Sequence, residues 1–89
     1  MRAIVTVIGK DRVGIIASVT NLLSRHGVNV LDISQTVLQE YFTMIMLVDA
    51  SACSVPFAEL SRALDADGQK QGLQIRAQRE EVFNAMHRI

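Results

Sequence analysis

Apolar positions along the 89-residue chain change their period several times, and each change predicts a new element. Residues 3–8, AIVTVI, are rich in β-branched side chains and end at Gly9, which predicts a first strand. From Val13 onward the apolar side chains recur every three or four residues, which predicts a helix that ends before Gly27. The positions on this helical face are Ile15, Ile16, Val19, Leu22, Leu23 and His26.

Two strands joined by a tight turn are predicted in the middle of the chain. Residues 28–39, VNVLDISQTVLQ, form a strand with polar residues on both faces, and residues 40–50, EYFTMIMLVDA, form the next. This third strand is apolar on both faces, although a sheet with helices on one side needs only one apolar face. We expect a partner subunit or the terminal helix to cover the second face. The two apolar sets are Phe42, Met44, Met46 and Val48 on one side, and Ile45 and Leu47 on the other.

The second half of the chain predicts a helix, a strand and a short terminal helix. Pro56 suits a first helical turn, and the segment 67–72, DGQKQG, ends this helix. Residues 73–79, LQIRAQR, alternate as in a half-buried strand. Residues 80–89 have apolar side chains at helical spacing and predict a C-terminal helix. The apolar positions of the two helices are Phe57, Leu60 and Leu64 in the first, and Val82, Phe83, Met86 and Ile89 in the second.

This β-α-β-β-α-β order predicts an α+β, ferredoxin-like sandwich. It has a four-stranded antiparallel sheet with both main helices on one face, plus the short C-terminal helix. Residues 1–89 make a single domain, because the chain is too short for two. A monomer of this size buries only a little over ~60% of its unfolded surface. We therefore expect the chain to form at least a homodimer.

Composition limits the classes of partner that the chain can bind. Nine basic and nine acidic residues cancel, which argues against a nucleic-acid or membrane partner recruited by bulk charge. No run approaches the roughly 18 apolar residues of a membrane span, and the first apolar stretch is too short for a signal peptide. A lone cysteine, Cys53, excludes an internal disulfide. We expect a cytoplasmic protein.

Several kinds of chemistry lack the residues they need. Gly9 and Gly14 have phosphate-loop spacing, but Ile15 and Ile16 follow where Lys and Ser or Thr are required. The two histidines lie far apart in the sequence and lack a ligand at helical spacing, so we expect no metal and no cofactor. Cys53 has no base nearby in the sequence, and we expect no catalytic residues.

Two alternatives from other functional classes remain. A small acyl-phosphate hydrolase has an arginine for phosphate and an asparagine for water, and Arg12 and Asn29 supply these types without a general acid or base. An RNA-binding module needs outward aromatic residues on its central strands, and only Tyr41 and Phe42 lie on a strand here.

The loop GKDRVG, residues 9–14, carries the chemistry that favours a ligand site. Asp11 has two interpretations, a cap for the first helix or a partner for an ammonium group. Free N–H groups at a helix N-terminus suit a carboxylate, and a nearby aspartate suits an ammonium. Together they match a free α-amino acid. Gly14 lets a ligand approach the backbone closely.

Residues 11–36, DRVGIIASVTNLLSRHGVNVLDISQT, resemble the signature region of ACT domains. The matching features are Asp11 in the loop, Gly14 at the start of the helix, and the segment 27–30, GVNV, at the start of strand two. The segments DISQT and FNAMHRI resemble small stand-alone ACT proteins of bacteria. The chain is also similar to the regulatory modules of formyltetrahydrofolate deformylase and of the glycine-cleavage repressor.

The resemblance implies regulation rather than catalysis. ACT domains pair side by side through strand two, and small ligands, usually amino acids, lie between the first loop of one subunit and strand two of its neighbour. Most ACT domains are fused to the domain that reads the ligand. We expect this chain to have no such domain, so that either it acts on a separate protein or it has lost the sensing. The ligand-binding residues implied are Gly9, Lys10, Asp11, Arg12, Val13 and Gly14 in the loop, and Asn29, Asp32, Ile33 and Gln35 opposite.

Overall fold

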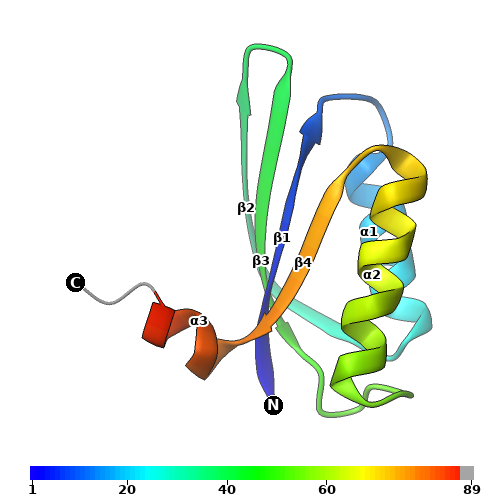
Figure 1. The fold of residues 1–89 in the computed structure, drawn as a ribbon, viewed down its shortest axis with the longest axis vertical. Coiled ribbons are helices and arrows are strands. Elements are labelled where there is room, and N and C mark those ends of the chain that lie inside the picture. The colour runs from blue at the N-terminus through cyan, green and yellow to red at the C-terminus, as the bar shows by residue number, and fades with distance from the viewer. Residues whose placement is uncertain (87–89) are drawn as a thin grey trace.

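The computed structural model describes residues 1–86 and confirms the α+β sandwich. The sheet has the strand order β2-β3-β1-β4, and every neighbouring pair is antiparallel. Helices α1 and α2 cover one face, and α3 lies on the other side (Figure 1). The end of the predicted C-terminal helix, including His87 and Ile89, lies outside the described residues. The elements are β1 (Arg2–Lys10), α1 (Ile15–Arg25), β2 (Asn29–Leu38), β3 (Tyr41–Asp49), α2 (Phe57–Gln71), β4 (Gln74–Arg79) and α3 (Glu80–Met86).

The core lies between the sheet and the two main helices. The predicted inward residues of β3 are buried, as are alternate residues of β1 and the apolar stripes of both helices. This follows from the two periods in the sequence, because alternate strand positions and every third or fourth helix position meet in one layer. No helix in residues 1–86 is long and apolar enough to cross a membrane. The fully buried side chains with the largest volumes include Ile15, Leu23, Met44, Met46, Leu60, Leu64 and Ile75.

Glycines set the ends and the packing of the helices. Gly27, at φ +75°, follows α1, and Gly72, at φ +72°, ends α2, as the sequence predicts. Gly68 lies inside α2 for a different reason. A Cβ there would come within 2.8 Å of the Leu73 carbonyl oxygen and 3.0 Å of Ile75 Cγ1. The missing side chain therefore lets α2 pack directly on β4.

Strand β2 forms one edge of the sheet and is exposed along almost its whole length. A two-residue turn, Gln39 and Glu40, joins it to β3 as predicted. A β-bulge between Val30 and Asp32 shifts its register against β3. Strands β1 and β2 both run antiparallel to β3, so they run in the same direction. The start of β2 and the loop that follows β1 therefore lie at opposite ends of the sheet.

Candidate functional site

Backbone contacts hold the loop between β1 and α1. The Asp11 N–H donates to the Glu40 carbonyl at 2.7 Å, which ties the loop to the β2–β3 turn. At its other side, Gly9 packs against Leu73 so closely that a Cβ at Gly9 would overlap the leucine side chain. Gly9 thus has a packing role that does not depend on a ligand.

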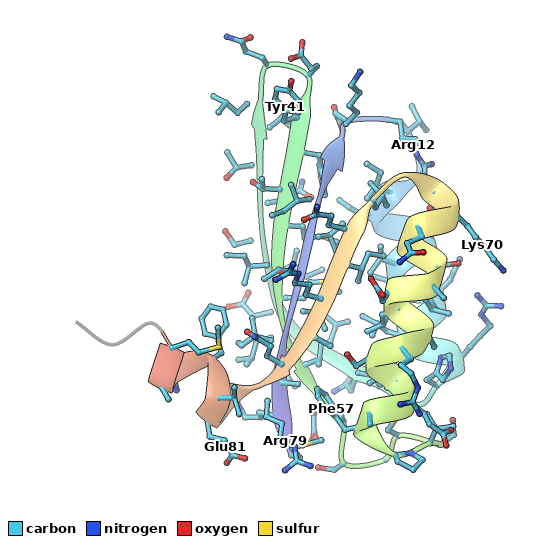
Figure 2. All side chains as sticks on the ribbon, in the orientation of Figure 1. Arg12, Tyr41, Phe57, Lys70, Arg79 and Glu81 are labelled. Atoms are coloured by element: carbon cyan, nitrogen blue, oxygen red, sulfur yellow. The ribbon has the colours of Figure 1, made fainter. Side chains whose placement is uncertain are left out.

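Helix α2 holds the loop's arginine. Arg12 Nη2 donates to Gln71 Oε1 at 2.5 Å, and Ser18 Oγ donates to the same oxygen at 3.0 Å. Gln71 Nε2 in turn donates to Asp67 Oδ2 at 2.5 Å. Figure 2 shows Arg12 at the end of the sheet where the last turn of α2 lies. The guanidinium is therefore positioned by a residue far away in the sequence.

The N-terminus of α1 has no side-chain cap among the described residues. The interpretation of Asp11 as a helix cap is therefore wrong. Gly14 occupies the N-cap position at φ +92°, a conformation that favours glycine. A Cβ on Gly14 would meet nothing within 4 Å, so there is free space beside the helix start. The first N–H groups of α1 remain available to an anion.

A cavity of about 540 Å³ lies at this helix start. It brings together four predicted site residues, Asp11, Arg12, Gly14 and Gln35. The remaining loop residues, Gly9, Lys10 and Val13, do not line it, and Val13 is 98% exposed. The other lining residues, which the sequence analysis did not assign to a site, are Ile15, Ile16, Ala17, Val37 and Phe42.

Asn29, Asp32 and Ile33 do not line the cavity of their own chain. Asn29 is registered with Asp49, next to the first residue of β1, whereas the loop begins at the other end of that strand. Arg12 and Asn29, the pair considered for an acyl-phosphate hydrolase, are likewise apart within one chain. Asp32 Oδ1 accepts a hydrogen bond from the Ile33 N–H at 2.9 Å.

The other described residues considered for chemistry do not form a second site around the loop. Residues 1–86 contain no group of three or more His, Cys, Asp or Glu side chains that could hold a metal ion. His26 Nδ1 lies 2.9 Å from the Leu22 carbonyl at the end of α1. Hydrogen bonds from the Ser51 side chain and backbone lower the pKa of Asp49, far from the loop. Phe42 is buried in the core, so it does not offer the exposed ring that stacking on RNA needs.

Comparison with known sequences identifies relatives of nearly the same length. The ACT domain family model matches residues 2–78. A UPF0237 protein of Clostridium acetobutylicum is 54% identical over 89 residues, and each chain covers 100% of the other. A UPF0237 protein of Methanocaldococcus jannaschii is 47% identical over 88 residues, covering 99% of this chain and 98% of that protein. The relatives thus include archaeal as well as bacterial proteins.

Solved structures agree with this assignment. An ACT domain protein from Streptococcus pneumoniae superimposes with a TM-score of 0.83 at 42% identity, covering 98% of both chains. A putative glycine cleavage system transcriptional repressor matches with a TM-score of 0.74 at 24% identity, covering 86% of this chain and 44% of that protein. A formyltetrahydrofolate deformylase from Pseudomonas syringae pv. tomato matches with a TM-score of 0.78 at 22% identity, covering 88% and 27%.

The repressor and the deformylase show that the fold is shared. The family model and the close relatives show that the chain shares ancestry with ACT domains. ACT domains are typically regulatory modules that bind small molecules. The loop, the uncapped helix and the long exposed edge strand described above occur together in a chain that belongs to the ACT domain family.

Proposed function

We propose that this chain is a regulatory module that binds a small amino-acid-like ligand as a homodimer in the cytoplasm and signals to a separate partner protein. The observation that carries the proposal is the cavity at the uncapped start of α1. It combines free backbone N–H groups with the Asp11 carboxylate and the Arg12 guanidinium. A zwitterion needs both kinds of partner at once.

The lining of the cavity supports an amino-acid-like ligand. The N–H groups of α1 and the Arg12 side chain favour a carboxylate, while Asp11 favours an ammonium. Ile16, Val37 and Phe42 supply an apolar wall for a small aliphatic side chain. The empty space beside Gly14 lets the carboxylate approach the helix start.

The edge strand β2 supports the homodimer. It is ten residues long, and its apolar side chains Ile33 and Val37 are 39% and 53% exposed. Such an edge is prone to pair with another strand. Antiparallel pairing of two β2 strands about a two-fold axis would place the Asn29 end of one chain beside the Leu38 end of its neighbour. Leu38 shares a row with Tyr41 and Lys10, where the neighbour's loop begins.

A thermal-shift screen against the amino acids and folate-related metabolites tests the proposal. Glycine and formyltetrahydrofolate are included because two proteins with this fold are named for glycine cleavage and formyltetrahydrofolate. A ligand at one hundred times its Kd adds about 2.7 kcal/mol of stability. Each kcal/mol moves the Tm of a domain of this size by about 4–8 °C, so a ligand is easily seen.

Two variants then locate the site. Asp11→Asn and Asn29→Ala should each weaken binding by roughly ten- to a hundredfold, because each removes a partner of a charged group. Asp11 does not cap α1, so Asp11→Asn should leave the free energy of unfolding nearly unchanged. Asn21→Ala, on the exposed side of α1, is the matched control. Wild-type affinity in both test variants, measured by calorimetry, would place the site elsewhere.

We also propose that the chain is not an enzyme. The chemistry closest to the residues present is hydrolysis of an acyl phosphate by Arg12 and Asn29. Acetyl phosphate incubated with the wild-type chain should be stable. Turnover that disappears in Arg12→Ala would replace the regulatory proposal with a catalytic one.

A further inference from the structure

The face of the sheet opposite α1 and α2, here called the open face, carries a second cavity. It measures about 470 Å³ and lies between the open face and α3. We propose that this cavity binds a small monocarboxylate with an apolar tail, with Arg76 as the anchor for the carboxylate. It lies across the sheet from the loop cavity, so it is a site additional to the proposed function.

Strand register arranges the open face in rows. Apolar residues and two threonines occupy the centre, acidic and hydroxyl side chains lie along β2, and amides and a guanidinium lie along β4. Ile8 and Ile45, in the central strands, are each 50% exposed. The rows are Ser34, Ile45, Thr6 and Arg76; Thr36, Thr43, Ile8 and Gln74; and Asp32, Leu47, Ile4 and Gln78.

Helix α3 forms the other wall of the cavity. It follows β4 without a loop, and its first residue Glu80 forms an ion pair with Arg2 at 2.8 Å. At the other end of α3, Met86 Sδ accepts a hydrogen bond from Gln78 Nε2 of β4 at 3.3 Å. None of the residues of α3 is buried. The helix is thus fixed beside the sheet without closing onto it, as Figure 1 shows.

Phe83 and Met86 of α3 line this cavity together with Ile8 and Ile45 of the open face. These four side chains make two facing walls of the cavity apolar, one on the sheet and one on α3. A volume of about 470 Å³ lies within the range of small-molecule sites, which is about 300–1,000 Å³. The compartment therefore suits an alkyl or aromatic tail.

Arg76 determines the charge of the ligand. Among residues 1–86, it is the only charged residue that lines the cavity. Arg2 pairs with Glu80, and Arg79 lies 3.9 Å from Glu81 and over the Phe57 ring (Figure 2). Arg76, by contrast, forms no ion pair with any of residues 1–86.

The neighbours of Arg76 complete the recognition of an anion. Thr6 lies opposite Arg76 in the register, and Gln74 and Gln78 lie two positions away on the same face of β4. Their hydroxyl and amide groups can donate hydrogen bonds to a carboxylate. One guanidinium with neutral donors around it suits a single negative charge, which favours a monocarboxylate over a polyphosphate.

An NMR titration of the full chain with 3-phenylpropionate tests the site, with the neutral 3-phenylpropanamide as the matched ligand. The acid should shift the amide signals of Thr6, Ile8, Gln74 and Arg76 saturably. The neutral analogue should bind about fivefold more weakly, because an exposed arginine–carboxylate pair is worth up to about 1 kcal/mol. Arg76→Gln should abolish this preference for the acid, and Arg62→Gln on α2 should retain it.

Phe83→Ala separates the tail from the charge. It should weaken the acid and the amide by the same factor, because both ligands carry the same phenyl tail. Asp11→Asn should leave both affinities unchanged, so failure of the loop site and failure of this site are distinguishable. The proposal is wrong if 3-phenylpropionate gives no saturable shift, if shifts are confined to residues 9–14, or if wild type binds acid and amide equally. It is also wrong if Phe83→Ala halves the mass in light scattering, since a second copy would then occupy this face.

Discussion

Gln71 connects the candidate ligand loop to the end of α2. Its carboxamide oxygen accepts hydrogen bonds from both Arg12 and Ser18, and its nitrogen donates to Asp67. One side chain thus fixes the arginine of the loop and the first turns of α1 relative to α2. A ligand carboxylate that binds Arg12 would break its hydrogen bond to Gln71 and so change the contact between the loop and α2.

We predict that Gln71→Ala loosens the loop. The loss of the Arg12 partner should raise hydrogen exchange at the Asp11 amide by up to about tenfold, because local opening then costs up to about 1.4 kcal/mol less. Gln69→Ala is the matched control, since the exposed Gln69 donates its side-chain hydrogen bond to Asp65 at 3.4 Å and not to the loop. Equal exchange in both variants, measured by mass spectrometry or NMR, would show that Gln71 does not hold the loop.

Gly68 gives a second prediction at the residue scale. Helix propensity alone expects Gly68→Ala to stabilise α2 by about 1 kcal/mol. Contact with the Leu73 carbonyl and Ile75 should outweigh this, and the variant should lose about 1–3 kcal/mol in urea unfolding. A gain in the free energy of unfolding would contradict the close packing of α2 on β4.

The residues of the loop site could be predicted to different extents. Asp11 and Gly14 are recognisable because their chemistry is local to one turn between a strand and a helix. Gln71 is not, since it is 59 positions from Arg12 and no pattern joins the two. The capping interpretation of Asp11 failed because capping depends on backbone dihedral angles. Gly14, at φ +92°, takes the N-cap position itself.

At the scale of elements, the position of β2 explains why its sequence has polar residues on both faces. A strand covered on one face alternates in polarity, but β2 is an edge strand and is exposed along nearly all its length. Polar residues on both faces therefore predict its exposure correctly. They do not predict whether another strand pairs with this edge, because edge pairing uses backbone groups that every sequence has.

We predict that a charge on this edge prevents dimerisation. Ile33→Lys should give a folded monomer, because the side chain is 39% exposed and an edge lysine disfavours strand pairing. Light scattering at micromolar concentration should report twice the chain mass for wild type and one chain mass for the variant. Val82→Lys, on α3 and 44% exposed, is the matched control. A dimer that persists in Ile33→Lys would require another interface.

Across the whole molecule, order and topology follow from the alternation of strand and helix periods. The apolar second face of β3 was also recognised, and α3 lies on that side of the sheet. The distance between Asn29 and the loop residues 9–14 cannot be predicted from their spacing in the sequence. It follows from the shared direction of β1 and β2, which places the start of one opposite the end of the other. The proposed site therefore requires the loop of one copy and Asn29 of another.

Mixing two damaged variants tests this shared site directly. In the proposed symmetric dimer each site takes its loop from one chain and Asn29 from the other. A mixed dimer of Asp11→Asn and Asn29→Ala then has one site with both defects and one with neither. Random exchange of equal amounts should restore wild-type affinity at about one site in four, as calorimetry with a ligand from the screen would measure. Mixing Asp11→Asn with the double variant should restore none, because every loop is damaged. If the first mixture also restores none while both variants still dimerise, the site lies within one chain.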